Sequence, residues 1–213
     1  MGLFDIFKKK PEATKPAPTL DGWWPVYSQF GDNIYASDVV VQALKCIVDE
    51  LKKLKPMHVR YNGSDPTPEK ASTIQAVLDN PNPLMTTSEF LEKTFWLLLL
   101  NYNAFIIPTY YTWRDEKTGE TRRRYKELYP IKPTEVDFLE DASGETFVRF
   151  WFLNGEETTL RYSDIIHLRL NYSVNQYMGG NELGQPDYKA LLETLETNHE
   201  LLHGIAKAMK ASY

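Results

Sequence analysis

The fold of this chain is decided by one segment, Asn80–Tyr111, which reads NPNPLMTTSEFLEKTFWLLLLNYNAFIIPTYY. Thr86 and Glu89 stand three residues apart near its start, which is the spacing of a capping box. In a capping box the hydroxyl and the carboxylate each accept a hydrogen bond from the other residue's free backbone N–H. The sequence therefore predicts a helix that begins at Thr86 and runs to about Asn101.

The middle of this helix is apolar on every side. From Phe95 to Ile107 there are 13 residues, interrupted by the polar triplet NYN. A helix that spans a bilayer needs about 20 apolar residues, so we expect no membrane partner. We interpret the segment as a central helix that is buried on most sides. The core residues expected around it are Phe90, Phe95, Trp96, Leu98, Leu99 and Phe105.

The totals of the sequence restrict its class. The chain has 213 residues, 42% of them hydrophobic and 25% charged, which is typical of a globular protein with one or two domains. Its formal net charge of -5 argues against a broad nucleic-acid-binding face, which requires clustered Lys and Arg. The single cysteine, Cys46, excludes a disulfide within the chain and favours a reducing compartment. Its apolar helical setting predicts a core thiol.

The chain divides into three expected regions. The start, MGLFDIFKKK, has its lysines after its apolar residues, which is the reverse of a secretory signal. The stretch KPEATKPAPTL that follows is typical of an extended, proline-rich linker. We therefore expect a flexible arm and linker at residues 1–22, an α+β domain at 23–185 and a helix at 186–213.

Two shorter helices are expected before the central one. The first runs from Ser37 to about Lys55, where Pro56 ends it. Its apolar stripe consists of Val40, Leu44, Ile47, Leu51 and Leu54. After a short strand in MHVRY, Pro68 is placed to open a second helix that ends near Leu78, because proline is tolerated in a first turn.

Strands follow the central helix. Alternating apolar residues and glycine-containing turns predict two hairpins and two further strands, arranged as one antiparallel meander. The strands expected are AFIIPTYY, TRRRYKELYPI, EVDFLE, TFVRFWFL, TTLRY and DIIHLRL. Helices followed by such a meander and one long last helix indicate the α+β class.

The last helix is expected to run from Asp187 to the end of the sequence. Its apolar seam has near-heptad spacing and consists of Leu191, Leu195, Leu202, Ile205 and Met209. This spacing suits packing against a long helix of a neighbouring subunit. Packing on the sheet of its own chain is the alternative, and the sequence leaves both open.

The motif HELLH matches the pattern of a zinc peptidase. His199 and His203 lie four residues apart on one helix, and Glu200 has the position of a general base. A catalytic zinc needs a third protein ligand. The ten residues after His203 contain no His, Asp or Glu, and the two imidazoles fall at the polar margin of the seam. We interpret the motif as a coincidence and expect no metal, no cofactor and no catalytic residue.

Three other motifs have structural interpretations. His167 stands among strand-forming residues without a neighbouring base or nucleophile, so a structural role is expected. Gly179–Gly184, GGNELG, lacks the lysine and the spacing of a phosphate-binding loop, which predicts a flexible loop. Arg122–Arg124 is the densest basic cluster, and we expect it to pair with acidic residues of its own exposed hairpin.

Taken together, the sequence resembles the portal proteins of long-tailed bacteriophages with lambdoid-type heads. The resemblance rests on the start MGLFDIF, on the helix at 37–55 and on three blocks further along. These blocks are LDNPNPLMTTSEFLEKTFWLLLLNYNAFIIP, ELYPIKPTEVDF and YSDIIHLRL. The sequence departs from the family at Tyr102, where the family usually has glycine, and it stops at Tyr213. It therefore resembles the family's wing and the start of its stem, with the clip, second stem helix and crown absent.

The resemblance implies a structural protein that is not an enzyme. Portal proteins form a twelve-fold ring at one capsid vertex, through which double-stranded DNA passes without sequence-specific binding. The implied partners are other copies of the chain, the terminase large subunit, the major capsid or scaffold protein and a head–tail adaptor. The implied location is the virion, with the host cytoplasm during assembly. The alternatives are a zinc metallopeptidase that uses HELLH, and a protein-interaction adaptor that docks through the aromatic-rich sheet.

Overall fold

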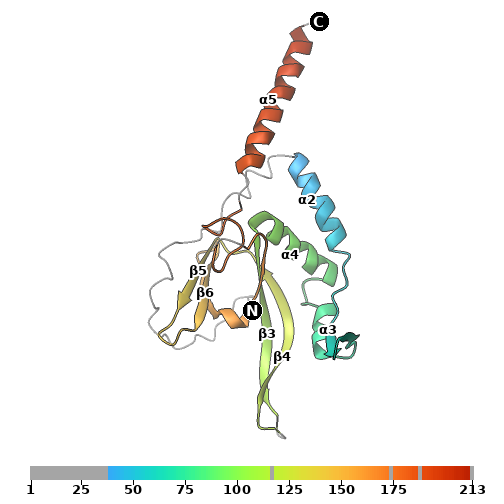
Figure 1. The fold of residues 1–213 in the computed structure, drawn as a ribbon, viewed down its shortest axis with the longest axis vertical. Coiled ribbons are helices and arrows are strands. Elements are labelled where there is room, and N and C mark those ends of the chain that lie inside the picture. The colour runs from blue at the N-terminus through green and yellow to red at the C-terminus, as the bar shows by residue number, and fades with distance from the viewer. Residues whose placement is uncertain (1–37, 116–117, 173–174, 187–188, 212–213) are drawn as a thin grey trace.

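The computed structural model describes residues 38–115, 118–172, 175–186 and 189–211. Within them the chain combines helices with antiparallel sheets, which confirms the predicted α+β class (Figure 1). The arm expected at 1–22, the Ser37 cap and the helix start at Asp187 lie outside the described residues. The helices are α2 Asp38–Leu51, α3 Thr73–Asp79, α4 Thr87–Asn101 and α5 Lys189–Ala211.

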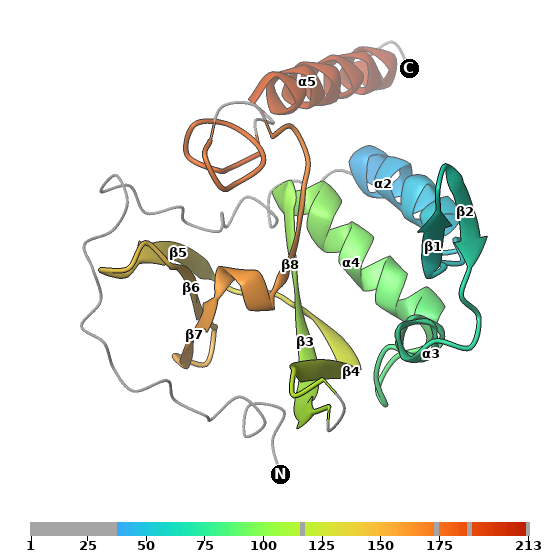
Figure 2. The same cartoon turned by 60° about the horizontal axis from the view of Figure 1, so that its bottom comes forward.

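Helix α4 begins at the predicted capping box. Thr86 Oγ1 accepts a hydrogen bond from the Glu89 N–H (3.3 Å), and Glu89 Oε2 accepts one from the Thr86 N–H (2.8 Å). These bonds satisfy donors that a helix start leaves free, so the predicted start is confirmed. α4 lies along strand β3 (Asn103–Arg114) on one side and against α2 on the other (Figure 2).

Helix α2 is shorter than predicted. It ends at Leu51, four residues before the expected end at Lys55. The chain tightens there, because the Leu54 N–H donates to the Leu51 carbonyl (3.1 Å), three residues back instead of four. Pro56 then keeps Lys55 out of the helical conformation.

The face that α2 buries also differs from the predicted stripe. Val40 and Val48 are buried, whereas Ile47 and Leu54 are exposed. Positions four residues apart share a helix face, so a face centred on Val48 turns Cys46 outward. Cys46 is exposed, and the expectation of a core thiol is wrong.

The segment before α4 contains a hairpin where a helix was expected. Strands β1 Val59–Asn62 and β2 Asp65–Pro68 pair through a tight turn in which Gly63 has a φ of 71°. Pro68 therefore ends a strand and does not open a helix. α3 begins at Thr73 instead, capped by Ser72 Oγ, which accepts from the Gln75 N–H (2.9 Å). The prediction at Pro68 is wrong because the two-residue loop Gly63–Ser64 has glycine at its first position, which favours a hairpin.

The expected single meander is divided into two sheets. β4, β3 and β8 form one antiparallel sheet in that order, and β5, β6 and β7 form the other. β8 pairs with β3, from Asn103↔Arg169 to Ile106↔Ile166, and not with β7. The turn of 3-10 helix Tyr162–Asp164 redirects the chain between them. The strands are β3 Asn103–Arg114, β4 Thr121–Ile131, β5 Glu135–Glu140, β6 Thr146–Trp151, β7 Glu157–Arg161 and β8 Ile166–Arg169.

Strand β3 is buried on both faces at its beginning. Phe105 and Ile107 point into a core between the two sheets, whereas Ala104 and Ile106 point toward α4. A strand covered on both sides is expected to be continuously apolar, which explains the run AFII. The core between the sheets consists of Phe105, Ile107, Ile131, Val136, Phe138, Val148, Phe150 and Met178.

The predicted core residues fall into two groups. Phe90, Leu98 and Phe105 are buried, whereas Phe95, Trp96 and Leu99 are half-buried. α4 therefore buries one broad face, and the expectation that it is buried on most sides needs this correction.

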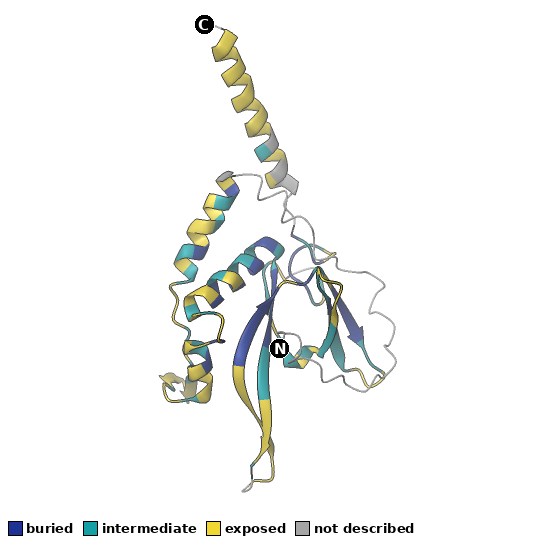
Figure 3. Cartoon of the chain, turned by 180° about the vertical axis from the view of Figure 1, so that it is seen from behind, coloured by how far each residue is buried: buried dark blue, intermediate teal, exposed yellow. Residues whose placement is uncertain are grey.

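Helix α5 stands apart from the rest of the fold. Figures 1 and 3 show it projecting beyond the body of the molecule. Of its described side chains, Leu195 is half-buried and the others are exposed. The alternative in which this helix packs on the sheet of its own chain is therefore wrong for the described residues. None of the described helices combines the length and apolar character that crossing a bilayer requires.

Candidate assembly site

Beside the loop that leads to α5, one buried side chain, Asn103, joins several elements of the fold. Its Oδ1 accepts hydrogen bonds from the Gly179 N–H (2.7 Å) and from His167 Nε2 (3.0 Å). Its Nδ2 donates to the carbonyls of Asn101 and Gly179 (both 3.0 Å) and of Gly184 (3.3 Å). Asn103 thereby connects the first residue of β3 to β8 and to the loop that leads to α5.

His167 has a structural role in this network. The Tyr162 O–H donates to His167 Nδ1 (3.1 Å), so the ring proton lies on Nε2 and is donated to Asn103. The imidazole stacks on the ring of Phe105, with 4.1 Å between centroids. Burial, together with the positive charge of Arg169, lowers the pKa of His167 to about 3. The ring is therefore neutral at physiological pH, which suits a buried hydrogen-bonding position.

The loop Gly179–Gly184 is packed, and the expectation of a flexible loop is wrong. A Cβ on Gly179 would lie 2.2 Å from the Leu170 carbonyl oxygen and 2.5 Å from that of Tyr102. Gly180 has a φ of 102° and Gly184 a φ of 70°, conformations that side chains disfavour. These glycines allow the loop backbone to approach β8 and the end of α4 closely.

Tyr102 joins α4 to β3 in a left-handed conformation, with a φ of 56° and a ψ of 5°. Its carbonyl accepts a hydrogen bond from the Leu170 N–H (2.8 Å). Helices commonly end with glycine at a left-handed position, because glycine has no Cβ to oppose it. The backbone thus explains why glycine is usual here in the resembled family, and nothing in the structure explains the tyrosine that replaces it.

The predicted seam on α5 lies on the surface. Leu191, Leu202, Ile205 and Met209 have between 40% and 60% of their area exposed. An apolar stripe of this length on an isolated helix is typical of a surface that packs against another helix. The structure brings the seam together on one side of α5 and leaves it uncovered.

The HELLH residues lie on the same exposed helix. The rings of His199 and His203 face each other, with 5.7 Å between centroids. In the described part of the chain, no group of three or more His, Cys, Asp or Glu side chains is arranged to hold a metal ion.

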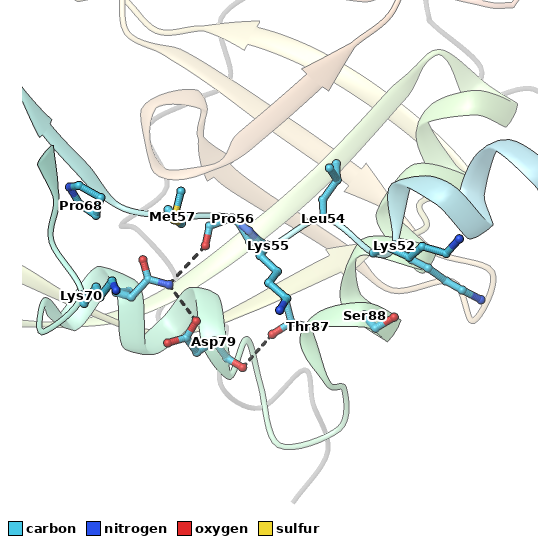
Figure 4. A pocket seen from close by; sticks show the side chains of 12 residues that line it. Lys52, Leu54, Lys55, Pro56, Met57, Pro68, Lys70, Asp79, Thr87 and Ser88 are labelled. Carbon is cyan, nitrogen blue, oxygen red and sulfur yellow. Dashed lines mark hydrogen bonds between the residues drawn. The ribbon is translucent and has the colours of Figure 1, made fainter. Parts of the chain in front are cut away.

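A lysine-rich hollow lies where the end of α2 meets α3 (Figure 4). It has a volume of about 650 Å³ and opens to solvent. Lys52 forms ion pairs with Asp49 (2.6 Å) and Glu92 (3.4 Å), so part of its positive charge is neutralised. Gln75 bridges the hollow by donating to the Pro56 carbonyl (3.3 Å) and to Asp79 (2.8 Å). These contacts join the elements, and they provide no nucleophile with its base.

The second exposed surface is the end of the β3–β4 hairpin. Arg123 forms an ion pair with Asp164 and stacks over Tyr110, with 4.5 Å to the ring centroid. Arg122 pairs with Asp115 (3.5 Å) and Glu120 (3.4 Å) of the same hairpin. Charge pairing across the hairpin therefore occurs as expected, and one partner, Asp164, comes from outside it.

Sequence reasoning missed the residues that organise this region. Asn103 lies between a helix and a strand in NYNAF, where an asparagine suggests a turn and carries no signal of burial. The paired glycines of GGNELG were the available clue, because glycine marks close backbone approach as well as flexibility.

Comparison with known proteins gives two kinds of match. The family model for the phage portal protein matches residues 38–213. Among curated proteins no match is found. Two solved structures share the fold: the neck of an empty gene transfer agent (GTA) particle computed with C6 symmetry, and the virion of a native gene transfer agent particle.

Both structural matches are distant in sequence. The neck chain has a TM-score of 0.59 and 15% identity, covering 92% of this chain and 49% of that one. The virion chain has a TM-score of 0.58 and 14% identity, covering 88% and 46%. The present chain thus spans about half the length of these neighbours, and at such identities they show the fold alone. The match of the family model over most of the sequence shows that the chain belongs to the phage portal protein family.

Proposed function

We propose that this chain supplies the wing and the start of the stem of a portal protein, a ring at one capsid vertex through which DNA is packaged and ejected. The observation that carries the proposal is the exposed apolar seam of α5, which projects from an otherwise packed body. A lone helix with such a seam gains stability by packing against a helix of the next subunit. Membership of a family of structural proteins supports the same role.

We propose that the two parts of the chain have different roles. Residues 23–185 would form the wing, which contacts neighbouring subunits and the capsid, and 186–213 would form the first stem helix. The proposed partners are eleven further copies of the chain, the terminase large subunit, the major capsid or scaffold protein and the head–tail adaptor. The two structural neighbours come from a particle neck and a virion, which supports a place in the virion after assembly in the host cytoplasm.

The charge of the chain suits a channel for DNA. A formal net charge of -5 disfavours tight binding to phosphates, since each neutralised phosphate strengthens the grip on DNA. DNA that must slide in both directions requires weak contacts. We therefore propose that no cofactor and no catalytic step is involved, and that terminase supplies the chemistry of packaging.

Electron microscopy of the complete protein that carries this chain tests the proposal. We expect ring-shaped particles. Leu202→Asp combined with Ile205→Asp should abolish them while leaving the circular dichroism of the body unchanged, because both side chains are exposed. Thr197→Asp combined with Ala211→Asp is the matched control, since both positions are exposed and lie more than 100° from the centre of the seam. Monomers under all assembly conditions, or rings formed equally by the double variant, contradict the proposal.

A further inference from the structure

The free end of the β3–β4 hairpin is basic and aromatic on one face. In residues 109–126 six basic residues stand against three acidic ones, a net charge of +3. Tyr111 pairs with Arg124 and Trp113 with Arg122, so these four side chains share a face of the ribbon. Tyr111 is 49% and Trp113 45% exposed. Tyr, Trp and Arg are the residue types that dominate binding energy at protein interfaces.

The opposite face of the hairpin is already occupied. Arg123 and Tyr110 belong to it, and Arg123 reaches the body of its own chain through Asp164. On the other face, Arg124 lies 5.9 Å from the ring centroid of Tyr111. Among the described residues, Arg122 forms ion pairs with Asp115 (3.5 Å) and Glu120 (3.4 Å) of its own hairpin, and half of its side chain is exposed. The face available to a partner is therefore the one that carries Tyr111, Trp113, Arg122 and Arg124, and we call it the free face.

The second sheet has the opposite charge. Between Glu135 and Glu157 there are seven acidic residues and one basic residue, a net charge of -6. The basic residue, Arg149, is engaged by the buried Asp137 (2.8 Å). Glu135 pairs with Trp151, which pairs with Glu157, so the three lie in one row across the sheet on the same face. Both glutamates are exposed, and neither forms an ion pair with another described residue.

We infer that the free face of the hairpin end in one copy docks on the Glu135–Trp151–Glu157 row of the next copy. This inference rests on the ring proposed above. The two arginines are about 7 Å apart along their strand, and the two glutamates about 10 Å apart across three strands. Arginine side chains are long enough to match these spacings. Trp113 or Tyr111 would then lie beside Trp151, whose ring already has Arg149 over it at 4.7 Å from the centroid.

The two surfaces are different and lie on different parts of one chain. Figures 1 and 2 show the hairpin end projecting away from β5 and β6. A contact between two unlike surfaces is heterologous and repeats from copy to copy, so it closes a ring when the rotation allows. Nucleic acid is the other partner that a basic and aromatic hairpin suits, and the experiment below distinguishes it from a second copy of the chain.

Charge exchange in the complete protein tests this contact. Arg122→Glu with Arg124→Glu should prevent ring formation in native mass spectrometry at about 0.15 M salt, and so should Glu135→Arg with Glu157→Arg. A mixture of the two double variants should form rings again, because each reversed surface then meets a reversed partner. All four substitutions in one chain should restore rings as well. Arg60→Glu with Lys70→Glu, which makes the same charge change on exposed positions elsewhere, should leave rings intact.

The outcomes separate the contact from the ring itself. If the unaltered protein forms no rings, the proposed function fails and the contact falls with it. Rings in both double variants overturn the contact alone. Loss of rings that neither the mixture nor the fourfold variant restores also overturns it. If Arg122→Glu with Arg124→Glu keeps rings but loses binding to a 30-base-pair DNA duplex, the hairpin serves nucleic acid instead.

Discussion

The loop at residues 175–186 and helix α5 follow each other in the chain and are held in opposite ways. The loop has no regular secondary structure, yet Met178, Gly179 and Gly184 are buried and Asn103 binds it at three backbone atoms. α5 is a regular helix of 23 residues, yet its described side chains are almost all exposed. A segment can therefore be fixed by tertiary contacts without regular backbone hydrogen bonds, and a regular helix can have few tertiary contacts. The loop is fixed by tertiary contacts, whereas the described side chains of the apolar seam of α5 are exposed apart from the half-buried Leu195.

The largest difference between the two regions is expected when an asparagine is replaced in each. Asn103→Leu removes the acceptor for the Gly179 N–H and for His167 Nε2, which leaves two buried donors without partners. At about 2 kcal/mol for each donor, the free energy of unfolding should fall by about 4 kcal/mol. Urea denaturation of the chain measures it. Asn198→Leu on exposed α5 should change it by less than about 0.5 kcal/mol. Equal effects would mean that Asn103 does not hold the loop.

Replacing a glycine by alanine should change stability in opposite directions in the two regions. Gly179→Ala places a Cβ against two backbone oxygens and should lower the free energy of unfolding by about 3 kcal/mol. Gly204→Ala meets open space in the middle of α5 and should stabilise the helix by about 1 kcal/mol. Thermal melting reports the first, and far-ultraviolet circular dichroism of helix content reports the second. A tolerated Gly179→Ala would show that the loop moves freely from β8.

The pH dependence of stability should come from the buried network and not from α5. The pKa of His167 is lowered to about 3 in the folded chain from 6.5 when unfolded, so between these values the unfolded state binds more protons. Stability is then complete above pH 6.5 and decreases as the pH falls toward 3. From pH 7.5 to pH 5 the loss should be about 2 kcal/mol.

Urea midpoints at the two pH values measure this loss. His167→Gln should lower stability at both values but remove most of the difference between them. His203→Gln, on the exposed helix, should keep the difference. A pH dependence that survives in His167→Gln would assign it to other groups.

The smallest expected effect concerns Tyr102, where the helix that supports the loop ends. Tyr102→Ala and Tyr102→Gly remove the same side chain, but only glycine relieves the left-handed conformation. The glycine variant should be more stable than the alanine variant by about 1 kcal/mol. Comparing two variants cancels the lost contacts of the tyrosine ring. Equal melting temperatures would place the strain elsewhere.

The parts of the fold that were predictable are those set by near neighbours in sequence. Thr86 and Glu89 fixed the start of α4, and Gly119 and Gly144 lie in the turns of two predicted hairpins with positive φ. Prediction was wrong where two local signals competed: Pro68 suggested a helix start, but the Gly63–Ser64 loop made its segment part of a hairpin. It was also wrong at Cys46, because this residue lies two positions, or about 200°, from the buried Val48 and therefore on the opposite face of α2.

The candidate site was less predictable than the fold. The seam of α5 could be listed from its spacing, but whether it packs on its own sheet or stays uncovered depends on where the sheet lies. The sequence identified β8 as a strand but did not identify the strand it pairs with. Both β3 and β7 had a free edge, and the turn at Tyr162–Asp164 directs β8 to β3. The charged surfaces of the hairpin and of the second sheet emerge only when strand register is known.

The sequence by itself determined the α+β class, the start of α4, the turns of the hairpins and the absence of a span in the described helices, since each depends on residues a few positions apart. Only the tertiary structure decided that Asn103 is the centre of the region below α5. Its partners Gly179 and Gly184 lie 76 and 81 residues further along the chain. Hydrogen bonds over such separations depend on how β3, β8 and the loop pack together, and local sequence patterns do not predict that packing.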